Sequence, residues 1–138
     1  MSDTLNICGL TVERGHKLRT FLPVPDTNVK IPLTIINGCE DGPTLLITAG
    51  IHGGEYPGIA AAMELGRDIE PADVNGILIM MHPVNIQGFW ARREMIVPED
   101  GKNLNRVFPG DPLGTLADKT AYLISSNFFP IADFYVDM

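Results

Sequence analysis

Residues 44–58 read TLLITAGIHGGEYPG and hold the strand, turn and helix pattern that decides the fold. The first six residues, TLLITA, form a short and almost wholly apolar run, which is typical of a strand buried on both faces. After the turn, apolar residues recur at helical spacing, and Pro57 suits a first helical turn because no donor is lost there. The pattern predicts a strand over residues 44–49, followed by a helix that ends at about Asp68.

The segments on either side extend this pattern into a β-α-β unit. Residues 29–37 (VKIPLTIIN) are rich in β-branched residues and predict a strand, and residues 40–43 (EDGP) predict a turn after it. Beyond a break at residues 71–75, residues 76–81 (GILIMM) predict a second buried strand. Two buried strands joined by a helical crossover imply a parallel sheet.

The remaining chain predicts a long functional connection, a helix and a strand. Residues 82–114 show no sustained periodicity, and a connection of this length is usually functional. Thr115 and Asp118 resemble a capping box that opens a helix, and Pro130 ends it. Residues 132–138 (ADFYVDM) predict a further strand. Neither a linker nor a repeat divides the sequence, so residues 1–138 are one domain or part of one.

The composition excludes several classes of protein. The 138 residues are 45% hydrophobic and 20% charged, which is globular, and the net charge of −7 opposes binding to nucleic acid or to an anionic membrane. No apolar segment approaches the ~20 residues of a membrane-spanning helix, and the N-terminus lacks the features of a signal peptide. Cys8 and Cys39 predict free thiols in a reduced, cytoplasmic protein.

The turn His52-Gly53-Gly54-Glu55 is the strongest candidate for a metal site. It follows a buried strand, where ligands of open α/β sheets collect. An imidazole and a carboxylate three positions apart can converge on one ion, and Zn²⁺ accepts such ligands, although this spacing also occurs by chance. The rival interpretation is the oxyanion-hole loop of an α/β-hydrolase, which needs a G-x-S-x-G elbow that the sequence lacks.

A second candidate lies in residues 100–110 (DGKNLNRVFPG), where an amide and a guanidinium stand side by side. An arginine fork and a neighbouring asparagine suit a carboxylate-bearing ligand. Asp-Gly and Pro-Gly are equally typical of an ordinary surface turn. Four basic residues fall within fifteen positions here, either as a local site for a small anion or as solvated loop charges: Arg92, Arg93, Lys102 and Arg106.

Taken together, the motifs resemble the succinylglutamate desuccinylase/aspartoacylase branch of the zinc carboxypeptidase-like hydrolases. The resemblance rests on H-x-x-E, a Pro-Val-Asn loop followed by Arg92, N-L-N-R-x-F-P-G and A-D-F-Y-V-D, over roughly residues 44–138. It implies a three-layer α/β/α fold with a mixed, largely parallel sheet. It also implies that His52 and Glu55 bind one zinc ion and that Asn105 and Arg106 bind the substrate carboxylate. Catalytic Arg92 would lie near the scissile carbonyl, with Arg93 as the alternative.

The departures from the family predict a truncated domain. The resemblance places the third zinc ligand directly after Met138 and the general-base glutamate further on. His82 is expected to have a structural or second-shell role, and Asp137 a second-shell one. An uncovered strand at residues 132–138 would favour self-association into a homo-oligomer.

The implied activity is zinc-dependent hydrolysis of the amide bond of a small N-acyl amino acid or related carboxylate. Two alternatives stay open: a metallocarboxypeptidase acting on peptides, and a catalytically incomplete fragment that binds a small anion or a metal.

Overall fold

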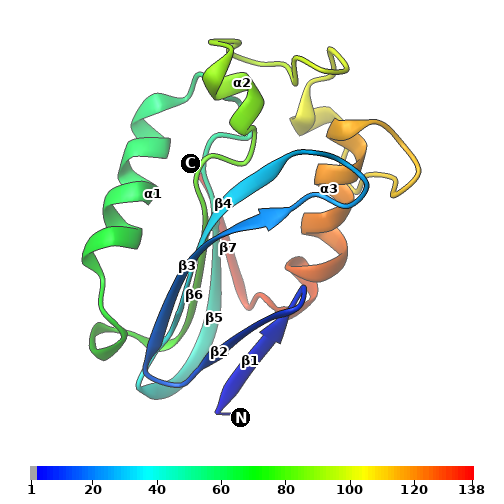
Figure 1. Cartoon of the computed structure of the whole chain (residues 1–138). Helices are drawn as coiled ribbons and strands as arrows, with labels where there is room; N and C mark the ends of the chain where they lie inside the picture. The colour runs from blue at the N-terminus through cyan, green and yellow to red at the C-terminus, as the bar shows by residue number, and fades with distance from the viewer. Residues whose placement is uncertain (1–2) are drawn as a thin grey trace.

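The computed structural model describes residues 3–138, in which a mixed β-sheet carries helices on both faces (Figure 1). The strands are β1 (Thr4–Ile7), β2 (Leu10–Glu13), β3 (His16–Pro23), β4 (Lys30–Asn37), β5 (Glu40–Thr48), β6 (Asn75–Met81) and β7 (Phe134–Asp137). The α-helices are α1 (Tyr56–Asp68), α2 (Ile86–Trp90) and α3 (Leu116–Asn127). The 3₁₀ helices are η1 (Pro71–Asp73), η2 (Leu104–Arg106) and η3 (Phe129–Ile131).

The main sheet has the order β3-β4-β6-β5-β7 and combines antiparallel and parallel pairing. β4 pairs antiparallel with β3 and with β6, whereas β5 pairs parallel with β6 and with β7. The sheet is therefore mixed, as expected, and its parallel half is centred on β5. β1 and β2 form a separate antiparallel hairpin.

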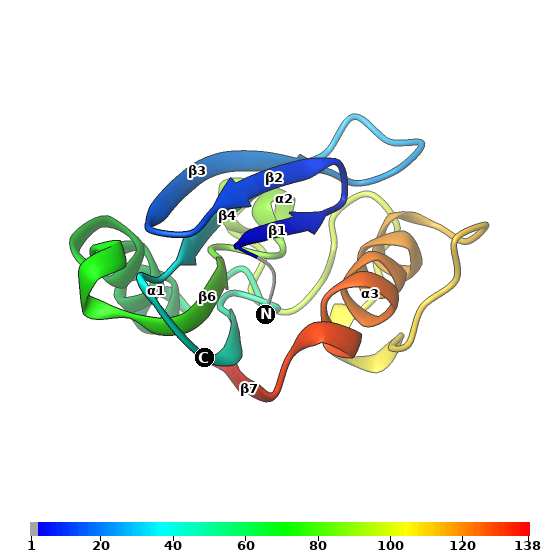
Figure 2. The same cartoon turned by 90° about the horizontal axis from the view of Figure 1, so that it is seen from below.

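The layers follow from apolar residues that alternate between the two faces of the sheet. Leu46 packs in the core that contains Leu123 and Ile124 of α3, while its neighbour Ile47 belongs to a cluster on the other face. Ile59 and Ala62 of α1 form a third cluster on that second face. Figures 1 and 2 show the sheet between α1 and α3, with the β1–β2 hairpin on the side of α3. This confirms the three-layer α/β/α arrangement and the expectation that TLLITA is buried on both faces.

The expected turn at residues 40–43 is wrong, because these residues extend β5 from Glu40. They run against the start of β6, and the pairing is irregular between Glu40 and Thr44. Gly42 permits this approach, since a Cβ there would lie 2.5 Å from the carbonyl oxygen of Asn75. Residues 40–43 therefore have the composition of a turn but form an irregular part of a strand.

The long connection at residues 82–114 has more order than its sequence predicts. It contains α2, whose first turn is capped by the Asn85 side chain accepting from Gly88 N at 2.9 Å, and it contains η2. The capping box of α3 is present as predicted, with Thr115 N donating to the Asp118 carboxylate at 2.9 Å. Among residues 3–138, no helix combines the length and the apolar composition needed to cross a bilayer.

Candidate metal centre

The turn from His52 to Glu55 lies between the end of β5 and the start of α1, and it packs directly on α2. Gly53 is buried, and a Cβ there would lie 2.4 Å from Phe89 N, so the turn can lie against the α2 backbone only with glycine at this position. Gly54 N donates to the carbonyl of Glu94 at 3.2 Å. The glycines of the motif therefore allow the turn to pack closely against α2 and Glu94.

The side chains of His52 and Glu55 face each other. His52 Nδ1 lies 3.0 Å from Glu55 Oε1, and His52 Nε2 lies 2.9 Å from Asn103 Oδ1. Asn103 Oδ1 also accepts the backbone N–H of Asn105 at 3.0 Å. A backbone N–H can only donate, so the amide oxygen of Asn103 must face this point and must accept from His52 Nε2–H.

This arrangement calls for a cation between His52 and Glu55. With Nε2 protonated, a neutral ring has its Nδ1 lone pair directed at the Glu55 carboxylate, which is also an acceptor. Either a second ring proton or a metal ion must lie between them. Desolvation opposes the charged ring, but hydrogen bonds to Glu55 and Asn103 and the charges of Glu55 and Asp137 outweigh it and raise the pKa of His52.

Asp137 of β7 extends the negative potential of this centre. Thr48 Oγ1 donates to Asp137 Oδ1 at 2.7 Å and lies 2.7 Å from the Tyr135 hydroxyl. Burial raises the pKa of Asp137, and the nearby charge of Glu55 raises it further, while the Thr48 hydrogen bond acts in the opposite direction. The structure thus places Asp137 within electrostatic reach of His52 and Glu55, which we call the metal pair because they are the two predicted zinc ligands.

The arginines predicted to bind the substrate (Arg106) or to act in catalysis (Arg92, or Arg93 in its place) form no ion pair within residues 3–138. Asn105 and Arg106 are exposed on η2, and Arg106 Nη1 contacts only its neighbour's carbonyl, Asn105 O, at 3.4 Å. Arg92 and Arg93 are exposed after α2, and Arg92 has a positive φ of 54°. Within residues 3–138 no hydrogen bond or ion pair joins these side chains to His52 or Glu55, so their roles stay predictions.

Lys102, the fourth residue of the basic group, forms an ion pair within the protein. Its ammonium group is paired with the Asp118 carboxylate of α3 and is not available to a ligand. Of the four basic residues, Arg92, Arg93 and Arg106 are left as candidates for binding a small anion, and that role stays a prediction.

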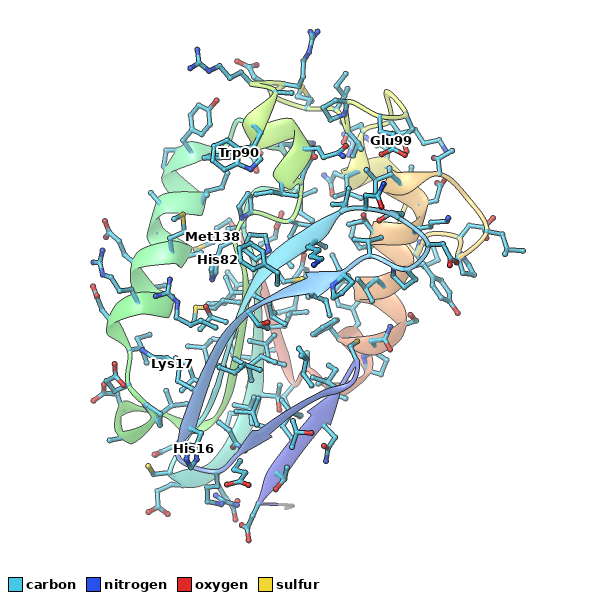
Figure 3. All side chains as sticks on the ribbon, viewed as in Figure 1. His16, Lys17, His82, Trp90, Glu99 and Met138 are labelled. Atoms are coloured by element: carbon cyan, nitrogen blue, oxygen red, sulfur yellow. The ribbon has the colours of Figure 1, made fainter. Side chains whose placement is uncertain are left out.

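Neither of the other two histidines completes the metal pair. His82 is buried and its Nε2 lies 2.9 Å from Thr34 Oγ1, so its ring faces a threonine of β4 (Figure 3). His16 is the first residue of β3, at the end of the sheet far from His52, and its Nδ1 lies 3.0 Å from the carbonyl oxygen of Arg14 (Figure 3). Within residues 3–138, no group of three or more His, Cys, Asp or Glu side chains is arranged to hold a metal ion. The described residues thus supply two zinc-type donors and no third.

Asn103 is the site residue that the sequence did not reveal. It belongs to the quoted motif NLNR, but the motif contains two asparagines and nothing in it shows which one reaches His52. That contact joins positions 51 residues apart. The only available signal was its place two residues before Asn105.

Comparisons with known proteins identify the family of the chain. A model of the succinylglutamate desuccinylase/aspartoacylase catalytic domain matches residues 41–138. The chain is 38% identical over 125 residues to the N-alpha-acetyl-L-2,4-diaminobutyric acid deacetylase of Halomonas elongata, covering 86% of this chain and 36% of the relative. The chain thus belongs to the succinylglutamate desuccinylase/aspartoacylase family, and it spans about a third of the length of that curated relative.

Solved structures show the same fold. A succinylglutamate desuccinylase/aspartoacylase from Rhodobacter sphaeroides matches with a TM-score of 0.83 and 34% identity, covering 92% of this chain and 41% of that one. The product-bound ectoine utilization protein EutE (DoeB) from Ruegeria pomeroyi matches with a TM-score of 0.83 and 38% identity, covering 91% of this chain and 40% of that one. These likenesses confirm the fold class.

Proposed function

We propose that this chain carries part of the active site of a zinc-dependent deacylase that cleaves the amide bond of a small N-acyl amino acid. The observation that carries the proposal is the pair formed by His52 Nδ1 and Glu55 Oε1, 3.0 Å apart, with Nε2 engaged by Asn103. Two acceptors in this position need either a shared proton or a metal ion between them, and nitrogen and oxygen donors suit zinc. Family membership and the deacetylase relative support the same reaction class.

In this proposal each residue of the chain has a separate task. His52 and Glu55 hold the zinc ion, and Asp137 adds negative potential behind them. Bound zinc supplies Lewis acidity and a water of lowered pKa. Asn105 and Arg106 bind the substrate carboxylate and so determine which carbonyl meets the metal. Arg92, or Arg93 in its place, stabilises the negative charge that develops on the carbonyl oxygen.

The substrate class follows from the free arginines and from the relative. Within residues 3–138 Arg106 forms no ion pair, and its exposed guanidinium suits a small carboxylate. The relative from Halomonas elongata is named as acting on N-alpha-acetyl-L-2,4-diaminobutyric acid. An N-acyl amino acid is therefore the proposed substrate class, and a cytoplasmic location stays a prediction. Peptide trimming by a metallocarboxypeptidase is the nearest alternative, since the same residues can bind a peptide C-terminus.

The test is equilibrium dialysis of the 138-residue chain against zinc, with bound metal measured by elemental analysis. We expect zinc binding that a mild chelator reverses, because the described donors number two where catalytic zinc takes three. His52→Ala and Glu55→Ala should abolish it, while His16→Ala, at the far end of the sheet, should leave it unchanged. Equal binding in all four proteins would disprove the metal pair.

The chain alone is expected not to turn over N-acyl amino acids, even when loaded with zinc. The reason is that His52 and Glu55 are only two donors. Hydrolysis of these substrates by the homogeneous, zinc-loaded chain would show instead that residues 1–138 contain a complete site.

A further inference from the structure

The segment from Asp100 to Arg106 is fastened to the rest of the molecule at several points. Asp100 Oδ2 accepts the backbone N–H of Ala117, in the first turn of α3, at 2.8 Å. Its other oxygen accepts Lys102 N at 3.0 Å. The Lys102 ammonium is paired with Asp118 of the same helical turn. Two side chains of the segment thus bind the first turn of α3, and we call this arrangement the loop–helix clasp.

The clasp is partly shielded from solvent. The Asp118 side chain is 15% exposed and that of Lys102 is 39% exposed. Asp118 also accepts from the Thr115 backbone N–H at 2.9 Å as part of the capping box. Because its orientation is set by the helix cap, Asp118 offers Lys102 a fixed partner, and a fixed, partly buried pair restrains the chain more than an exposed one does.

The metal pair is linked to the clasp through one intervening contact. Asn103 follows Lys102 directly, and its Oδ1 accepts from His52 Nε2 at 2.9 Å and from Asn105 N at 3.0 Å. Leu104, the next residue, is fully buried in the core. Asn103 is thus held between the clasp on one side and a buried anchor on the other.

We propose that the loop–helix clasp of Asp100, Lys102 and Asp118 is a positioning device for the metal pair: it holds Asn103 against His52 and so directs Nδ1 towards Glu55. None of the three residues contacts His52 or Glu55. Their effect passes through Asn103, so they are positioning residues. The inference rests on the proposed function for its zinc readout, but the orientation of the His52 ring can be measured without metal.

The informative change is Lys102→Met, which removes the ammonium and leaves the capping box of α3 intact. Lys119→Met is the matched control, because Lys119 lies next to Asp118 on α3 and has no ion pair within residues 3–138. Lys102→Arg restores a cation that can reach Asp118. Asp100→Asn weakens the other contact of the clasp, between Asp100 and the backbone N–H of Ala117. It replaces Lys102→Met if that variant does not fold.

The first measurement is the ¹⁵N–¹H imidazole spectrum of the metal-free chain, which has only three histidines to assign. We expect a His52 Nε2–H signal in the wild type, in Lys119→Met and in Lys102→Arg, and its loss through exchange with water in Lys102→Met. The signals of His82 should be unchanged in every variant, which a general loosening of the fold would not allow. An unchanged His52 signal in Lys102→Met would overturn the proposal.

The second measurement is zinc affinity by competition with a chelator. Residues that support a metal ligand typically change affinity 10- to 100-fold, so we expect about tenfold weaker binding in Lys102→Met and none of this loss in Lys119→Met. Equal affinities in these two variants would also count against the clasp. If the wild type binds no zinc, the zinc part of the proposed function fails, while the His52 spectrum still decides the role of the clasp.

Discussion

His82 illustrates how burial at a single residue sets a pH dependence. Desolvation lowers the pKa of its buried ring, and the charge of Arg19 lowers it further. The unfolded chain therefore takes up a proton at His82 at a higher pH than the folded chain does. The stability that His82 contributes is present above about pH 6.5 and is lost as the pH falls below that value.

We therefore expect the free energy of unfolding to fall more steeply on acidification in the wild type than in His82→Gln. Urea unfolding from about pH 7.5 down to about pH 5.5 measures the two slopes across the ordinary range of histidine. Identical slopes in the wild type and His82→Gln would show that the ring protonates equally in both states.

At the scale of elements, β3 stabilises the end of α1 through one side chain. The Lys17 ammonium donates to the carbonyls of Arg67 and Ile69 at 3.0 and 2.7 Å and to the Glu70 carboxylate at 2.9 Å (Figure 3). The last carbonyls of a helix lack partners within it, so a cation there satisfies them and opposes the helix dipole.

Lys17→Met should lower the free energy of unfolding by about 1–3 kcal/mol, because hydrogen bonds from a charged donor are lost while the apolar stem is kept. Chemical denaturation provides the measurement. Lys30→Met, at the exposed start of β4, is the control and should change stability little. An equally small effect for both variants would mean that water replaces the Lys17 contacts without cost.

The three N-terminal strands, β1 to β3, have no clear pattern in the sequence. β3 is an edge strand, and of its residues only Leu22 is buried, so its sequence HKLRTFLP has no clean apolar alternation. β1 and β2 are four-residue strands of a small hairpin. By contrast, TLLITA and GILIMM lie in the middle of the sheet, and burial on both faces makes their apolar runs easy to recognise.

At the scale of the whole molecule, one edge of the sheet is apolar. Within the described residues β7 pairs only with β5, and Phe134, Tyr135 and Val136 are 62%, 45% and 43% exposed. An exposed apolar edge strand can pair with a second chain. Self-association of the 138-residue chain therefore stays a prediction.

Light scattering across a range of concentrations tests this prediction. We expect the apparent mass to rise with concentration in the wild type and to stay monomeric in Val136→Lys, because a charge on an edge strand opposes pairing. Met63→Lys places the same charge on the exposed face of α1 and should associate like the wild type. A monomeric wild type at every concentration would contradict the expectation.

The sequence by itself determined the central strands, α1 and α3, the capping box at Thr115 and the adjacency of His52 and Glu55. These features depend on residues close together in the chain, whose spacing directly reports helix, strand or turn. It also contained enough of the motif pattern to indicate the family.

Only the tertiary structure showed which distant residues lie close to one another around His52, although the family resemblance had already suggested a second-shell role for Asp137. Asn103 lies 51 positions from His52, Asp137 lies 89 positions from Thr48, and Lys102 turned from a candidate ligand contact into a partner of Asp118. Such contacts arise because parallel strands bring their carboxyl ends to one edge of the sheet and because the long connection folds back across it. The spacing of residues along the chain does not show how the long connection folds back, so these contacts follow from the fold alone.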